Sequence, residues 1–233
     1  MGQVLITGGT GALGSAVTRR FLEDGHHVAV TCRNEQETER LRDGLGPLQA
    51  QLIAVEADVT DETSVDKAIA YVSEKLGTIE TLVHLVGAWH GGEPVHMHSV
   101  ATWRQMMDLN LTSAFLCCRA VLPAMRQANR GRIVLVSSRT AHQGRVGQAA
   151  YAIAKEGVAI LGEVIAEESR GTGVTANTIA PSVIDTPANR RAMPSADVDA
   201  WVSPEDAACI IAFLASGEAG QLRGAWLPAF GST

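Results

Sequence analysis

The sequence has few aromatic residues and no excess of positive charge. Its 233 residues include four Trp, two Tyr and four Phe, and 19 Lys and Arg stand against 25 Asp and Glu, a formal net charge of −6. A nucleic-acid-binding surface needs a basic face with aromatic rings for stacking, so we expect no nucleic-acid partner. With 46% hydrophobic and 19% charged residues, the chain has the composition of an ordinary globular protein.

Long apolar runs and metal-type cysteine pairs are also missing. No run approaches the ~18 residues that a membrane span needs, and the first residues lack the basic and apolar regions of a signal peptide. The four cysteines form no C-x-x-C pair, which is typical of reduced thiols in the cytosol. We therefore expect a cytoplasmic protein with no membrane partner and no bound metal.

Short apolar runs alternate with longer segments of helical period. The runs are β-branched and bounded by polar residues or glycine, as in buried strands; they span 4–6, 28–31, 52–55, 82–86, 133–136 and 174–179. Helices are predicted at 12–24, 35–44, 62–76, 99–128 with an interruption, 149–170 and 204–215. This alternation predicts a single doubly wound, Rossmann-like α/β domain over 1–233, with a parallel sheet of about seven strands and helices on both faces.

Two segments of this domain have features of their own. The helix predicted at 149–170 carries an apolar stripe, which packs either against the sheet or against a partner subunit; it consists of Ile153, Gly157, Ile160, Leu161 and Val164. The stretch 181–203 is too rich in proline for one long helix. We expect a short substrate loop at 187–203.

A glycine-rich turn follows the first predicted strand. The segment 7–14, TGGTGALG, opens the first helix, and its Gly9, Gly11 and Gly14 match the G-x-G-x-x-G dinucleotide fingerprint. Glycine lets the backbone approach a pyrophosphate, and the helix N-terminus offers unpaired N–H groups to that anion. A tight structural turn without a ligand is the alternative.

The tip of the second predicted strand bears on which dinucleotide is bound. An acidic residue there accepts hydrogen bonds from the ribose hydroxyls of NAD, whereas a basic residue favours the 2′-phosphate of NADP. The tip holds Cys32 and then Arg33, which favours NADP(H), but Glu35 is near enough to weaken the preference. NAD(H) stays possible, and Arg33 as a solvated surface charge is the alternative.

Tyr151 and Lys155 are spaced at i and i+4 for one helix face. A phenol titrates near pH ~10, and a nearby ammonium favours its ionised form, as an acid or base working near neutrality requires. Ser138 follows the strand predicted at 133–136, where its hydroxyl can hold a carbonyl oxygen facing Tyr151. A Y-x-x-x-K pair alone is common, so the interpretation depends on the combination.

Over essentially its whole length, the sequence resembles the short-chain dehydrogenase/reductase superfamily. The landmarks in family order are 7–14, Asp58-Val59, Asn110, Ser138, Tyr151 with Lys155, and 181–186. The resemblance implies that Tyr151 is the catalytic acid/base and that Ser138 orients the carbonyl. Lys155 would bind ribose and activate Tyr151, and Asn110 would anchor a water of the proton relay. The implied cofactor-binding residues are Thr7, Gly8, Gly9, Thr10, Gly11, Leu13, Gly14, Arg33, Asp58, Val59, Val86, Gly87, Tyr151, Lys155, Ile184 and Thr186.

The sequence departs from the family pattern after the fourth strand. Where the family has Asn-Asn-Ala-Gly, this chain has His84-Leu85-Val86-Gly87. The segments 86–92 and 185–194 are similar to those of quinonoid dihydropteridine reductases, a branch that usually lacks the serine. Three loop histidines, His90, His96 and His98, are expected to line the substrate cleft or to be solvated rather than to bind a metal.

These patterns together predict an oxidoreductase. We expect it to transfer a hydride between NADP(H) and a small-molecule carbonyl or alcohol substrate, and the resemblance implies a homotetramer or a homodimer. A quinonoid dihydropteridine reductase-like enzyme and a non-catalytic NADP(H)-binding sensor are the alternatives. A Ser–His hydrolase built on Ser138 and His142 is disfavoured, because the chain has no G-x-S-x-G motif.

Overall fold

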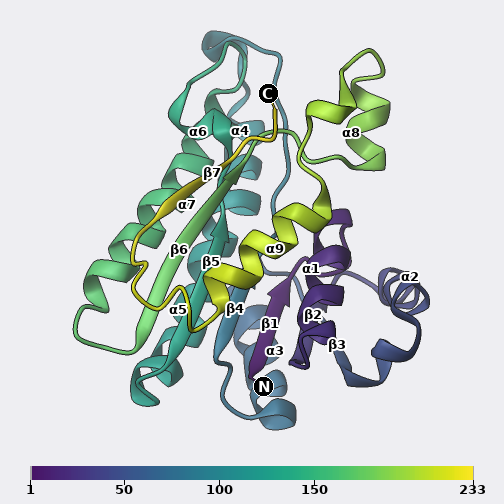
Figure 1. The fold of residues 1–233 in the computed structure, drawn as a ribbon. Helices are drawn as coiled ribbons and strands as arrows, with labels where there is room; N and C mark the ends of the chain where they lie inside the picture. Colours follow the sequence, from purple (N-terminus) through teal and green to yellow (C-terminus); the bar gives the residue numbers. More distant parts are fainter. Residues whose placement is uncertain (1, 233) are drawn as a thin grey trace.

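A single parallel sheet of seven strands forms the centre of the molecule (Figure 1). The computed structural model describes residues 2–232. The strand order is β3-β2-β1-β4-β5-β6-β7, and every neighbouring pair is parallel. The strands are β1 (Gln3–Thr7), β2 (His27–Cys32), β3 (Leu52–Glu56), β4 (Thr81–His84), β5 (Gly131–Val136), β6 (Val174–Pro181) and β7 (Trp226–Ala229). The predicted doubly wound fold is confirmed.

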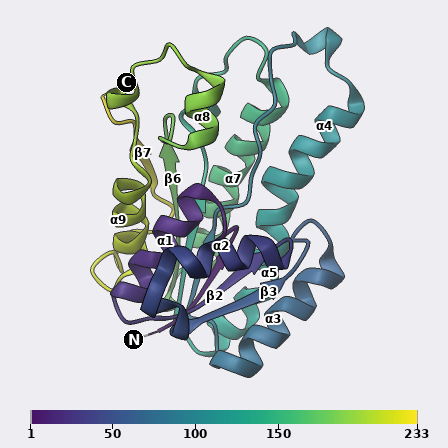
Figure 2. The ribbon, with the colours of Figure 1, turned by 90° about the vertical axis from the view of Figure 1, so that its right-hand side faces the viewer.

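Helices cover both faces of the sheet (Figures 1 and 2). On one face, α1 (Ala12–Glu23), α2 (Glu35–Leu45) and α9 (Pro204–Ala215) bury apolar side chains such as Phe21 and Ile211 against Ile6 and Val134 of the sheet. On the other face, α3 (Glu62–Leu76), α5 (Ser113–Gln127) and α7 (Ala149–Glu168) do the same. The strands are apolar on both sides because both sides are covered.

Four segments differ from, or add detail to, the sequence-based expectation. The strand expected at 82–86 ends at His84, so Leu85 and Val86 leave the sheet. The interruption expected within 99–128 is a π-helical turn, Asp108–Thr112, between α4 (Val100–Met107) and α5. The proline-rich stretch contains the short α8 (Pro187–Ala192) and a 3₁₀ turn at Val198–Ala200. The edge strand β7 was missed because its four residues include a proline, which a strand tolerates at an edge.

Three side chains of the apolar stripe of α7 are exposed, whereas Leu161 packs against the core on this face of the sheet. Ile153, Ile160 and Val164 are 49%, 47% and 45% exposed. The side of α7 that faces the sheet consists instead of small or apolar residues such as Val158 and Ile165. Of the two alternatives, burial against the sheet is therefore wrong for these three side chains.

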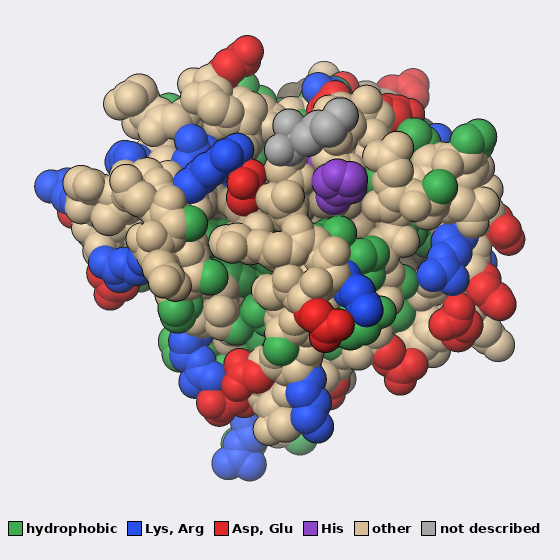
Figure 3. Space-filling model, turned by 90° about the horizontal axis from the view of Figure 1, so that it is seen from below, with side chains coloured by type: hydrophobic (Ala, Val, Ile, Leu, Met, Phe, Trp, Pro, Cys, Tyr) green, Lys and Arg blue, Asp and Glu red, His purple; other side chains and the backbone are tan. Residues whose placement is uncertain are grey.

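The surface at the amino-terminal ends of the strands carries both acidic and basic side chains, with neither sign predominating (Figure 3). At the amino-terminal ends of the strands, acidic and basic side chains alternate around the rim (Figure 3). Between residues 2 and 232, none of the helices combines the length and apolar character needed to cross a bilayer.

Candidate active site

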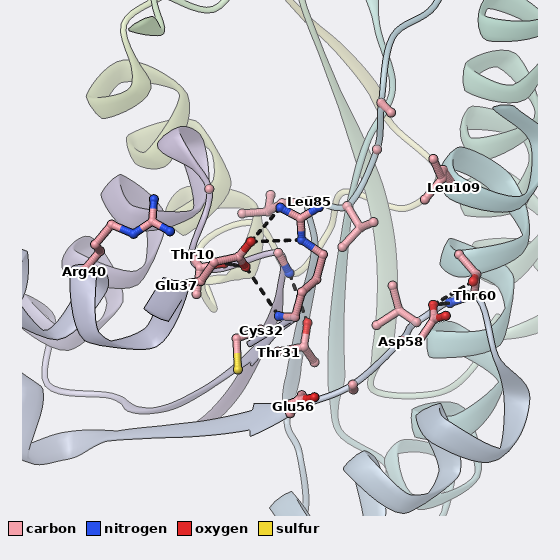
Figure 4. A pocket seen from close by; sticks show the side chains of 18 residues that line it. Thr10, Thr31, Cys32, Glu37, Arg40, Glu56, Asp58, Thr60, Leu85 and Leu109 are labelled. Carbon is pink, nitrogen blue, oxygen red and sulfur yellow. Dashed lines mark hydrogen bonds and ion pairs between the residues drawn. The ribbon is translucent and has the colours of Figure 1, made fainter. Parts of the chain in front are cut away.

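A cavity of about 850 Å³ opens at the carboxyl ends of β1 to β4 (Figure 4). The order of strands reverses between β1 and β4, and in open α/β sheets ligands bind in the crevice at such a reversal. A smaller cavity of about 400 Å³ shares the lining residues Gly8, Gly11 and Leu85 with it and extends to α8. The fold therefore provides one elongated site along the glycine-rich turn.

The glycine-rich turn leaves the backbone open to an anion. Gly8 has a positive φ of +72°, which favours glycine, and its carbonyl accepts a hydrogen bond from the Gly11 amide at 3.1 Å. A Cβ atom at Gly14 would overlap that carbonyl oxygen. Gly11 caps α1 without a side-chain hydrogen bond, so the first amides of the helix remain available for a pyrophosphate. These residues fit a dinucleotide.

Asp58 lines the cavity at the end of β3. Its Oδ1 accepts hydrogen bonds from the Thr60 amide at 2.9 Å and the Thr60 hydroxyl at 2.6 Å. These bonds lower the pKa of Asp58, against the smaller opposing effect of burial. The carboxylate is thus ionised and held in one orientation beside Val59.

Arg33 is bonded to an acidic residue that the sequence reasoning overlooked. Its Nη2 lies 2.6 Å from Glu37 Oε1, and its Nε donates to the same oxygen at 3.0 Å. The expectation that Glu35 opposes Arg33 was wrong, because Glu35 points to Arg42 at 3.4 Å. The i, i+4 spacing between Arg33, just before the N-cap of α2, and Glu37 in its first turn was the available signal.

Ser138 and Tyr151 come together at the carboxyl edge of the sheet. Ser138 follows β5 and caps the short α6 (Arg139–His142), where its Oγ accepts from the Thr140 amide at 3.3 Å. Tyr151 lies in the first turn of α7. Burial raises the pKa of the Tyr151 phenol, and a hydrogen bond with the Ser138 hydroxyl opposes this rise in part.

Lys155 is buried one helical turn beyond Tyr151, with 5% of its surface exposed. Its Nζ donates to the carbonyl oxygen of Val136 at 3.0 Å, and burial lowers its pKa from 10.5 to about 8. Burial and the hydrogen bond with Ser138 are the causes of the Tyr151 pKa shift in this structure, and the expected effect of Lys155 on the phenol stays a prediction.

Asn110 fixes the segment that follows β4. It lies fully buried in the π-helical turn, and its Nδ2 donates to the carbonyl oxygens of Ala88 at 3.0 Å and Met106 at 2.9 Å. Its Oδ1 accepts from the Ala88 amide at 3.2 Å. A Cβ at Gly87 would lie 2.7 Å from this oxygen and 2.8 Å from Lys155 Nζ, so only glycine fits between them.

His84 joins three elements inside the core. Its Nδ1 lies 2.8 Å from Thr7 Oγ1 and its Nε2 lies 3.1 Å from Ser113 Oγ. Because the Ser113 hydroxyl donates to the Leu109 carbonyl, it accepts from His84, which places the histidine proton on Nε2. Burial first, and then the charge of Lys155, lower the pKa of His84 to about 3. The ring is neutral.

The structure sorts the sequence-predicted cofactor residues into two groups. Those that line the two cavities are Gly8, Thr10, Gly11, Leu13, Gly14, Arg33, Asp58, Val59, Val86, Gly87 and Thr186. Those that line neither cavity are Thr7, Gly9, Tyr151, Lys155 and Ile184. Thr7 is bonded to His84, Gly9 packs against Val30, and Ile184 pairs with Val202. Sequence reasoning missed four charged lining residues, Glu37, Arg40, Glu56 and Arg191.

Two histidines of the segment between β4 and α4 contact each other, and a third histidine lies on α6. The rings of His90 and His98 meet edge to face, 6.2 Å apart. His142 is paired with Glu156 at 2.6 Å and stacks on Trp226, and no hydrogen bond within residues 2–232 joins it to Ser138. The arrangement lacks the Ser–His pair of a hydrolase.

Comparisons with known proteins agree on one family. The family model described as short chain dehydrogenase matches residues 3–196. The 3-oxoacyl-(acyl-carrier-protein) reductase MabA of Mycobacterium tuberculosis is 33% identical over 236 residues, covering 98% of this chain and 91% of MabA. The acetoacetyl-CoA reductase of Allochromatium vinosum is 30% identical over 238 residues, covering 97% and 96%. Among solved structures, ElxO with NADP bound has a TM-score of 0.94 at 26% identity, covering 99% of this chain and 98% of ElxO.

Proposed function

Because this chain belongs to the short-chain dehydrogenase/reductase superfamily, we propose that it is an NADP(H)-dependent oxidoreductase with Tyr151 as its acid/base. Members of this family act on CH–OH or C=O groups with a nicotinamide cofactor. The observation that carries the proposal is the pairing of the Ser138 and Tyr151 hydroxyls at the same sheet edge as the dinucleotide-type cavity.

The two hydroxyls are suited to hold a substrate carbonyl. Ser138 and Tyr151 donate hydrogen bonds to the carbonyl oxygen and stabilise the negative charge that develops there. A bound nicotinamide supplies or accepts the hydride. Because burial raises the pKa of Tyr151, the phenol is protonated at neutral pH and is ready to act as the acid in the reductive direction.

The neighbouring polar groups are assigned supporting roles. We assign to Lys155 the binding of the cofactor ribose and the activation of Tyr151, and to Asn110 a water of the proton relay. Ile184 and Thr186 are proposed to contact the nicotinamide carboxamide. Burial of Lys155 and Asn110 beside Gly87 is consistent with a fixed arrangement at this end of the cavity.

NADP(H) and a carbonyl substrate are the more specific parts of the proposal. Arg33 and Arg40 line the larger cavity, and a structural neighbour, ElxO, has NADP bound. Two relatives are named as reductases of 3-oxoacyl or acetoacetyl thioesters, which favours a ketone. We also propose a cytoplasmic homotetramer or homodimer, for which the exposed apolar side chains of Ile153, Ile160 and Val164 provide a contact surface.

The proposal is tested with Tyr151→Phe. We expect turnover of NADPH with a panel of ketones and aldehydes to fall at least ~100-fold, the usual effect of losing a general acid, while the Kd for NADPH stays within twofold. Tyr71→Phe is the matched control, because Tyr71 is 41% exposed on α3 and should behave as wild type.

Three outcomes would contradict the proposal. Unchanged turnover in Tyr151→Phe would remove the assigned acid/base. A wild-type protein that binds NADPH but turns over no carbonyl compound and no quinonoid dihydropterin would be a sensor instead. Turnover of the dihydropterin alone would favour the pteridine reductase alternative.

A further inference from the structure

The carboxylate of Glu37 lies between Thr10 and Arg33 at the rim of the larger cavity (Figure 4). One oxygen accepts from Arg33 Nη2 at 2.6 Å and Nε at 3.0 Å, and the other accepts from the Thr10 hydroxyl at 2.9 Å. The Glu37 side chain is 15% exposed, whereas that of Arg33 is 84% exposed. The acid is therefore enclosed between the glycine-rich turn and the arginine.

Glu37 is held in this place by the start of α2. The Asn34 side chain caps the helix and accepts from the Glu37 amide at 3.1 Å, which fixes the backbone under the carboxylate. Burial opposes the charge of Glu37, but the bonds from Arg33 and Thr10 outweigh it, so that the pKa of Glu37 is lowered. A fixed, ionised carboxylate thus faces the cavity at neutral pH.

This carboxylate acts oppositely on the two forms of a dinucleotide ribose. An unphosphorylated ribose presents hydroxyl donors, which a carboxylate accepts. A 2′-phosphate carries a charge of about −1.5 to −2, so it is repelled by Glu37 and must also compete with it for Arg33. The positive charge with which Arg33 would attract a phosphate is already partly neutralised by the carboxylate of Glu37.

No other acidic residue that lines the larger cavity is paired with Arg33 in the part of the chain that the structure describes. Asp58 is bonded to Thr60, and Glu56 makes no bond to Arg33 among residues 2–232. Arg40 lines the same cavity and forms no ion pair in the described part of the chain, its Nε donating to the Gln36 carbonyl at 3.2 Å. Without the charge of Glu37, two arginines would face a phosphate.

We propose that Glu37 is a specificity-determining residue that weakens the binding of NADP(H) relative to NAD(H). This rests on the proposed function, since it requires the cavity to hold a nicotinamide dinucleotide. It predicts that the wild-type protein binds both cofactors, with a preference for NADPH below about tenfold.

Fluorescence titration of Glu37→Gln with NADPH and NADH tests the proposal without any substrate. We expect the Kd for NADPH to fall about tenfold, which corresponds to about 1.4 kcal/mol, and the Kd for NADH to stay unchanged or rise. Glu35→Gln is the matched control, because Glu35 is on the same helical turn but pairs with Arg42. Both Kd values of this variant should equal those of wild type.

A second probe separates the adenosine end from the rest of the site. Adenosine 2′,5′-bisphosphate should gain affinity for Glu37→Gln by the same factor as NADPH, whereas 5′-AMP should not gain. Weaker or unchanged NADPH binding in Glu37→Gln would overturn the inference and would leave Glu37 as a support that positions Arg33 for the phosphate. Binding of neither cofactor by wild type would overturn the proposed function itself.

Discussion

Replacement of Lys155 with methionine should stabilise the cofactor-free protein although it removes a residue assigned to the active site. Burial lowers the pKa of Lys155 from 10.5 to about 8, so the folded state disfavours the ammonium by about 3 kcal/mol at 1.36 kcal/mol per pKa unit. Methionine has a similar unbranched chain without the charge. It loses the hydrogen bond to the Val136 carbonyl, which costs about 1 kcal/mol. We expect a net gain of about 2 kcal/mol in the free energy of unfolding at neutral pH.

The pH dependence of this gain identifies its cause. Because the folded pKa is below the unfolded one, the unfolded state holds more protons between about pH 8 and 10.5, and the stability of wild type rises with pH in that window. About 1.5 pH units above the folded pKa, wild type has recovered about 2 kcal/mol, so the difference from Lys155→Met should nearly vanish. Urea unfolding at pH 7 and near pH 9.5 measures both differences.

Lys67→Met, at an exposed position of α3, is the control. Its stability relative to wild type should be the same at both pH values. If the difference between wild type and Lys155→Met is also the same at both pH values, the burial of the ammonium does not cost what the structure indicates, and the reasoning is refuted.

Three further predictions concern the buried histidine, the smaller cavity and the apolar stripe. His84→Leu removes the acceptor of the Thr7 hydroxyl and the N–H that donates to the Ser113 hydroxyl, and should cost at least about 2 kcal/mol. Burial holds the pKa of His84 near 3, below its ordinary 6.5, so wild-type stability should fall as pH drops from 6.5 toward 3; in urea unfolding this contribution should be missing from the variant. Arg191→Gln should weaken NADPH and NADH binding by one common factor, about tenfold, because Arg191 lines the cavity beside the glycine-rich turn. Arg190→Gln, which removes a partner of Asp185 instead, should leave fluorescence titrations unchanged. Ile160→Asp places a charge in the exposed stripe of α7 and should yield monomers in sedimentation velocity; an unchanged mass would locate the subunit contact elsewhere.

Periodicity and composition were sufficient for most of the fold. Six of the seven strands and the longer helices were predicted to within a few residues, because buried parallel strands and amphipathic helices repeat their apolar positions in distinct ways. The π-helical turn at Asp108–Thr112 could be expected only as an interruption, since its geometry depends on the tertiary contacts of Asn110. The edge strand β7 was missed because it is only four residues long and contains Pro228.

The site was less predictable than the fold. The ion pairs and pKa shifts of its residues were the hardest features to predict. The positions of Ser138 after a strand and Tyr151 at the start of a helix predicted that the two side chains meet at the carboxyl edge of the sheet, and the structure has them there. The partner of Arg33 was misjudged, because Glu35 and Glu37 are both near it in the chain and the i, i+4 spacing that favours Glu37 was not used. The direction in which the pKa of Tyr151 shifts also depends on burial, and the Y-x-x-x-K spacing does not predict how deeply the phenol is buried.

Two parts of the proposed site are governed by different electrostatics. Around the Ser138–Tyr151 pair, burial dominates: it lowers the pKa of Lys155 and His84 and raises that of Tyr151. At the cavity wall formed by the start of α2, Arg33 is largely exposed and the ion pair with Glu37 dominates. Salt screens exposed charges far more than buried ones, with a Debye length of about 8 Å at physiological ionic strength. Cofactor selectivity should therefore weaken as ionic strength rises, whereas the stability difference caused by Lys155 should persist.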